Sequence, residues 1–88
     1  MGRYKILLRK SVGKDLRPIP NNDLQKILAA IESLSDEPRP AGAAKLSSQN
    51  KYRLRRGNYR ILYEIKDDEI VVIVVKVGHR RDVYQRAE

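Results

Sequence analysis

The residues of this sequence that could act on a nucleic acid are concentrated in its second half. From Lys51 to Arg60 the chain has five basic residues and no acidic one, and a second basic run begins at His79. Basic side chains with interleaved tyrosines are what phosphate contacts and base stacking require. The pattern predicts a nucleic-acid surface, although a solvated edge strand whose arginines prevent aggregation explains it about equally well.

The spacing of the arginines predicts how they meet. Arg53 and Arg55 must share one face of a strand because side chains alternate with a period of two. Arg60 follows a Gly-Asn turn signal and is expected on the neighbouring strand of a hairpin. The run 78–81 leaves a third strand, which is expected beside that hairpin. Two distant segments should therefore form one cationic surface, with three tyrosines nearby: Tyr52, Tyr59 and Tyr84.

The elements that position these residues begin with a strand and a short helix. A strand is predicted over residues 3–9. Ser11 is expected to cap a helix that continues to about Arg17, and Pro18 and Pro20 end it.

A longer helix follows. Asn21 or Asn22 is expected as its N-cap, with Asp23 in the first turn. One apolar stripe at helical spacing predicts its core face: Leu24, Ile27, Leu28, Ile31 and Leu34. Residues 35–50 are then predicted to be a connection in which Leu46 is buried.

Three strands complete the predicted fold, over residues 51–56, 59–66 and 69–77. The last contains an apolar run without alternation, so it is expected to be central and covered on both faces, and to end at Gly78. The order β-α-α-β-β-β predicts an α+β fold, with both helices on one face of a mostly antiparallel sheet. Residues 1–88 are expected to form a single domain.

Composition narrows the function. The formal net charge is +8, which favours nucleic acid, the ribosome or an acidic protein as partner. The chain has no cysteine and one histidine, which excludes thiolate chemistry and a His-rich zinc site. No carboxylate pair has metal-like spacing near the basic residues, and no apolar run is long enough for a membrane span. A cytoplasmic protein without metal or small-molecule cofactor is expected.

Several short motifs in succession resemble the RelE/ParE superfamily of type II toxin–antitoxin toxins. They cover nearly the whole chain: Lys14-Asp15-Leu16, Asp36-Glu37-Pro38-Arg39-Pro40, Gly42-Ala43-Ala44-Lys45-Leu46, Tyr52-Arg53-Leu54-Arg55, Gly57-Asn58-Tyr59-Arg60-Ile61-Leu62-Tyr63 and Val77-Gly78-His79-Arg80-Arg81-Asp82-Val83-Tyr84. The last motif is more similar to the RelE branch, whose members are ribosome-dependent mRNA endonucleases. The ParE branch shares the fold and inhibits DNA gyrase without a nuclease site.

The resemblance implies a site made of Arg53, Arg55, Arg60, Arg80 and Tyr84. Well-studied members have lysines where Arg53 and Arg55 stand here. Arginine essentially never loses its proton, so these two side chains suit fixed phosphate contacts better than proton transfer. His79 and Tyr84 are then the candidate bases, and the sequence leaves both open. Further basic side chains are expected to contact RNA: Lys45, Lys51, Arg56 and Arg81.

The resemblance also implies two partners. One is a RelB-like antitoxin, which an uncovered sheet edge and the positive charge suit. The other is the ribosome with its mRNA, held largely by phosphate contacts. Two other functions stay open at this point: gyrase inhibition on the same fold, and a basic RNA- or ribosome-binding module without catalysis.

Overall fold

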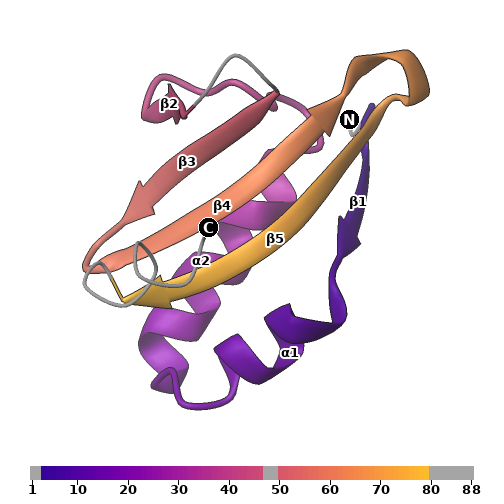
Figure 1. Cartoon of the computed structure of the whole chain (residues 1–88). Helices are drawn as coiled ribbons and strands as arrows, with labels where there is room; N and C mark the ends of the chain where they lie inside the picture. The colour runs from indigo at the N-terminus through magenta and orange to yellow at the C-terminus, as the bar shows by residue number, and fades with distance from the viewer. Residues whose placement is uncertain (1–2, 47–49, 80–88) are drawn as a thin grey trace.

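The fold is the expected α+β arrangement, with both helices on one face of a five-stranded sheet (Figure 1). The computed structural model describes residues 3–46 and 50–79. Its elements are β1 (Lys5–Leu8), α1 (Lys10–Leu16), α2 (Asn21–Ser33), β2 (Ala43–Lys45), β3 (Lys51–Arg56), β4 (Tyr59–Lys66), a 3-10 turn (Asp67–Glu69) and β5 (Val71–His79). The strand order is β1-β5-β4-β3-β2, in which only the β1–β5 pair is parallel.

The N-cap of α1 lies two residues before Ser11, and the N-cap of α2 lies one residue before Asn21. The N-cap of α1 is Arg9 and that of α2 is Pro20, and neither makes a side-chain cap hydrogen bond. The predicted caps at Ser11 and at Asn21 or Asn22 are therefore wrong. Prolines are favoured beside the first turn because their fixed φ suits the helix start, so Pro20 takes the boundary that the asparagines were expected to hold.

The core lies between the helices and the sheet. The apolar stripe of α2 is confirmed at Ile27, Ile31 and Leu34, which are buried, whereas Leu28 is 38% exposed and lies at the margin of the stripe. From the sheet, alternate residues of β3, β4 and β5 face the helices: Tyr52, Leu54, Ile61, Tyr63, Ile65, Val72, Val74 and Val77. Burial of these side chains removes apolar surface from water and is the main stabilising contribution.

The described part of the segment 35–50 contains a short strand in addition to the predicted connection. It contains β2, which pairs antiparallel with β3 at the sheet edge and was not predicted. Leu46 directly follows this strand and is 43% exposed, so the expectation that it is buried is wrong. A three-residue strand is too short for its alternation to be recognised in a sequence.

The last strand begins and ends two residues later than predicted, and it is not covered on both faces. Val72, Val74 and Val77 are buried, while Val71, Ile73 and Val75 are partly exposed. Gly78 does not end the strand, because it pairs with Arg60 and the strand continues to His79. The register between β4 and β5 shifts at Leu62/Tyr63, which leaves Val75 as the extra residue of a bulge.

The two hairpin turns differ in construction. Gly57 adopts a φ of 60°, a conformation that glycine tolerates at no steric cost, and this confirms the predicted Gly-Asn turn. At the opposite end of β4, Asp67 accepts hydrogen bonds from Tyr4 and Arg39. The β4–β5 turn is thereby joined to the N-terminus and to the segment before β2. Within the described residues, no helix is long and apolar enough to cross a membrane.

Candidate nucleic-acid interface

The outer face of the sheet, opposite the helices, is organised as rows of residues that pair across neighbouring strands. The first row holds Arg55, Arg60 and Gly78, on β3, β4 and β5 respectively. The second row holds Arg53, Leu62 and Lys76, and the third Lys51, Glu64 and Ile73. The sequence prediction that Arg53, Arg55 and Arg60 share one surface therefore agrees with the strand register.

Arg60 is the unusual member of this surface. It is 8% exposed, and its Nε atom is buried without a hydrogen-bond partner. One of its terminal nitrogens donates to the carbonyl of Tyr59 at 3.3 Å. Among the described residues, no carboxylate lies within ion-pair distance of it. An arginine on a hairpin strand often forms a cross-strand salt bridge, but Glu64 pairs with Arg9 instead. A buried charge without an ion-pair partner lowers the stability of the fold. An anion that binds here would form the ion pair that Arg60 lacks among the described residues.

Arg55 and Arg53 extend the positive charge around Arg60. Arg55 is exposed and lies directly opposite Arg60, where Cβ atoms are about 5 Å apart. Arg53 lies one row away on the same face and is half-buried. Like charges placed opposite each other repel, and a phosphate between the guanidinium groups would relieve that repulsion.

The carboxylates near the first row, those of Asp15 and Glu64, already pair with other groups. Asp15 of α1 accepts from Lys76 Nζ at 2.7 Å and from the backbone N–H of Val77 at 3.2 Å. This side chain therefore occupies the edge of β5 beyond the end of β1. Glu64 pairs with Arg9 at 3.5 Å. The positive potential of the first row is thus not neutralised by these acids.

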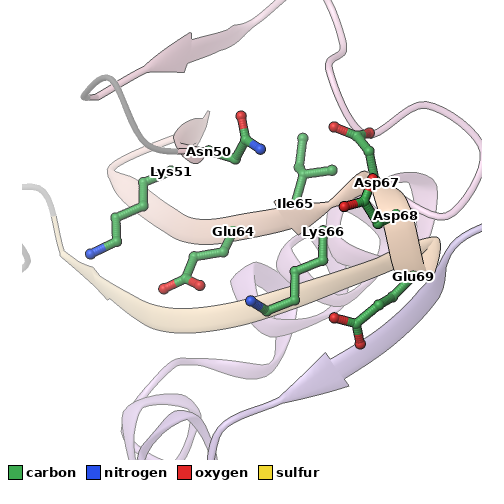
Figure 2. Close-up of a pocket in the computed structure, with 8 residues that line it drawn as sticks. All are labelled: Asn50, Lys51, Glu64, Ile65, Lys66, Asp67, Asp68 and Glu69. Atoms are coloured by element: carbon green, nitrogen blue, oxygen red, sulfur yellow. The ribbon is translucent and has the colours of Figure 1, made fainter.

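The far end of the sheet has the opposite character. A pocket of about 420 Å³ lies there, and Figure 2 shows Glu64 and Lys66 projecting from β4 while Ile65 points the other way. Three acidic residues of the β4–β5 turn also line it: Asp67, Asp68 and Glu69. Arg39, together with Tyr4, lowers the pKa of Asp67, which keeps this carboxylate ionised. Phosphate is therefore expected at the end of the sheet that carries the β3–β4 turn, and not at the end that carries the acidic β4–β5 turn.

His79 does not lie on the outer face with the arginines, as the sequence analysis expected. It pairs with Tyr59, and its ring packs edge-on against that tyrosine at 5.8 Å between centroids. Because it directly follows Gly78, which pairs with Arg60, it faces the helix side. It lines a cleft there with residues of α1, among them Asp15 and Lys14.

Two of the tyrosines are also on the helix side. Tyr52 stacks on Tyr63 at 5.8 Å and is covered by the Arg39 guanidinium at 5.3 Å. Tyr59 packs against the core and His79. The expectation that these two tyrosines lie beside the arginines is therefore wrong. The sequence showed the alternation correctly, but it could not show which alternate set faces the helices.

The further basic residues are divided between the two faces. Lys51 is on the outer face, beside Glu64. Lys45 pairs with Tyr52 and so projects toward the helix side. Arg56 pairs with Tyr59 and lines a surface pocket with residues of α2. The remaining predicted site residues, Arg80, Arg81 and Tyr84, lie outside the described residues. Within the described part of the chain, no group of three or more potential metal ligands is found.

Comparison with known proteins identifies the family. The family model described as ParE toxin of type II toxin-antitoxin system, parDE, matches residues 6–84, so the chain belongs to this family of the RelE/ParE superfamily. It is 32% identical over 85 residues to Toxin RelG of Mycobacterium tuberculosis, covering 94% of this chain and 98% of the relative. It is 36% identical over 86 residues to Toxin RelE3 of Methanocaldococcus jannaschii, covering 91% and 94%.

The fold is shared with solved toxins. The RelBE2 toxin–antitoxin complex of Mycobacterium tuberculosis contains a chain with a TM-score of 0.77 and 28% identity, covering 89% of this chain and 99% of that one. The protein is thus a RelE-like toxin of a toxin–antitoxin module.

Proposed function

We propose that this toxin is a ribosome-dependent mRNA endonuclease that cleaves mRNA in the ribosomal A site and so inhibits translation. The observation that supports it most is Arg60: a buried guanidinium without a carboxylate partner among the described residues, opposite a second arginine. A purely solvated basic surface would not bury such a group. The RelE names of the relatives favour the same activity.

The proposed reaction is an internal transfer at phosphorus. The 2′-oxygen of one nucleotide forms a bond to the adjacent phosphorus and gives its proton to a base. The bond from phosphorus to the 5′-oxygen breaks, and an acid protonates that oxygen. Arg60, Arg55 and Arg53 would hold the phosphate and stabilise the added negative charge of the transition state, which is the largest contribution available without a metal ion.

The proton transfer is assigned to Tyr84, with Arg80 as a further charge at the phosphate. Both assignments rest on the resemblance, since these residues lie outside the described part of the chain. His79 is the weaker candidate for the base, because its ring lies on the opposite face from Arg60. A base must be within hydrogen-bond reach of the proton it removes.

A RelB-like antitoxin is the proposed protein partner. The RelBE2 structure that resembles this chain is a toxin–antitoxin complex. The net charge of +8 suits an acidic segment that folds on the toxin surface. Both outer strands of the sheet, β1 and β2, pair on one side only and could accept an added strand.

The experiment is primer extension on an mRNA in a reconstituted translation reaction, with and without ribosomes. We expect cuts within codons in the A site only when ribosomes are present, and we expect them to persist in excess chelator if polyamines keep the ribosomes intact. Arg60→Ala should abolish the cuts. Arg56→Ala is the matched control. Arg56 was expected to contact RNA, but it is an exposed arginine on the helix side beside α2, so this variant should retain activity.

Inhibition of DNA gyrase is the second candidate, since the matching family model is that of the ParE toxin. An intact transcript in both reactions, together with inhibited supercoiling by purified gyrase, would replace the nuclease proposal with this one. Restoration of cleavage by one added metal after chelation would overturn the metal-independent mechanism alone. RNA binding without cleavage or gyrase inhibition would favour the non-catalytic module.

A further inference from the structure

A cleft on the outer face lies beside the arginine row. Its volume is about 480 Å³, within the range of sites that enclose a small ligand. Apolar and charged side chains both line it, chiefly Leu46, Leu62 and Val75 with Arg9, Lys51 and Glu64. It is distinct from the cleft that contains His79, which lies on the helix side.

The cleft is in register with the phosphate site. Arg60, Leu62 and Glu64 are alternate residues of β4 and point to the same face, about 7 Å apart from one to the next. A nucleotide whose phosphate binds Arg60 would place its base toward this cleft. Leu62 is only 4% exposed, so exposed Leu46 and partly exposed Val75 supply the apolar contact for the base.

Glu64 is unusual on a surface that binds phosphate. Its side chain is 20% exposed, and it makes one long ion pair, from Oε2 to Arg9 at 3.5 Å. Within the described residues, no hydrogen bond to the other carboxylate oxygen is found. A carboxylate repels phosphate, but it accepts hydrogen bonds from the amino groups of bases. In single-stranded RNA the base edges are accessible to such contacts.

We propose that this cleft binds one base of the mRNA and that Glu64 selects a base carrying an exocyclic amino group over uracil. The inference rests on the proposed nuclease function and adds a specificity-determining residue to it. The Arg9 side chain, which is mostly exposed, would orient the Glu64 carboxylate without contacting the base. Glu64 takes no part in the bond-breaking step.

The test compares codons in the ribosomal A site that differ at one position. Wild-type protein should cleave codons with adenine, cytosine or guanine at one position about 10-fold faster than the same codon with uracil, the size of a single base-reading contact. Glu64→Gln has the same shape but can donate as well as accept, so this preference should fall to about 2-fold or less. Lys66→Gln is the control and should retain the preference, because Lys66 is exposed on the same face of β4 but does not line this cleft.

Substrate variants test the same contact without altering the protein. Inosine differs from guanosine by the missing amino group, and purine riboside differs likewise from adenosine. Wild type should lose its preference on these bases, whereas Glu64→Gln should treat them like their parents. Equal preference in wild type and Glu64→Gln, or an equal loss in Lys66→Gln, would overturn the inference while leaving the nuclease proposal intact. Absence of any cleavage by wild type would instead contradict the proposed function itself.

Discussion

Arg60 lies directly opposite Arg55 in the β3–β4 pair, with Arg60 buried and Arg55 exposed. The two positions therefore differ in what they cost the fold. Arg55 can be solvated by water, whereas Arg60 has lost much of its hydration without gaining a carboxylate among the described residues. Burial of the Arg60 charge therefore lowers the stability of the fold, as is typical of a functional residue, whereas Arg55 is an ordinary surface charge.

Replacement of Arg60 by methionine should therefore separate activity from stability. Arg60→Met keeps much of the side-chain volume and removes the buried charge, so the Tm should stay unchanged or rise. Cleavage on the ribosome should fall by about 100-fold or more, as for loss of one transition-state contact. Thermal unfolding and primer extension on the same preparation measure both. A lowered Tm with full cleavage would show that Arg60 is a structural residue.

The pair Asp15–Lys76 should stabilise the end of β5. The side chains are 10% and 16% exposed, and Asp15 also accepts from the backbone of Val77. Asp15→Asn should lower the free energy of unfolding, because Lys76 then remains partly buried without its partner. A double-mutant cycle with Lys76→Met should give a coupling energy of about 1–3 kcal/mol by urea unfolding. Strictly additive single-mutant effects would contradict a direct interaction.

The fold was largely predictable because the long elements carry strong patterns. The stripe of α2 and the alternation of β3 and β4 each repeat over several turns or residue pairs. The errors lie where one local signal decides: the caps at Ser11 and Asn21, and the three-residue strand β2. At these places tertiary pairing and proline geometry outweighed the local preference.

The candidate site was predictable in part for a related reason. Strand periodicity placed Arg53 and Arg55 on one face, and the hairpin turn placed Arg60 beside them. The sequence could not show that β5 continues through Gly78 to His79, and this two-residue continuation places His79 on the helix side. Glu64 could not be assigned to a site from the sequence, because its cleft depends on residues from five separate segments.

Alkaline pH should destabilise the protein through Tyr63. Its hydroxyl donates to the Pro38 carbonyl at 2.7 Å, and burial raises its pKa to about 12. The contribution of Tyr63 to the free energy of unfolding is fully present below the unfolded pKa of about 10. It is lost as the pH rises from there toward 12, by about 1 kcal/mol per pH unit. The free energy of unfolding, measured with urea between pH 9 and 12, should therefore decline more steeply for wild type than for Tyr63→Phe. Parallel curves would contradict this assignment.

Acidic pH should act through Asp67. Hydrogen bonds from Arg39 and Tyr4 lower the pKa of this carboxyl group. Its stabilising contribution is therefore present above the unfolded pKa of about 3.9 and is lost as the pH falls through the lower folded value. The Tm of wild type should decline more steeply below pH 4 than that of Asp67→Asn, which has no such titration. Because the pair is exposed, added salt should reduce the difference.

Tyr84 and His79 can be distinguished by single variants at constant fold. Tyr84→Phe removes the hydroxyl and keeps the ring, so we expect cleavage to fall by about 100-fold or more if that hydroxyl transfers the proton. His79→Gln should stay within a few-fold of wild type, because its ring contacts Tyr59 on the side away from Arg60. Single-turnover cleavage on programmed ribosomes measures the rate of each variant against wild type. The opposite ranking of the two variants would mean that β5 turns His79 toward the arginine row when mRNA binds.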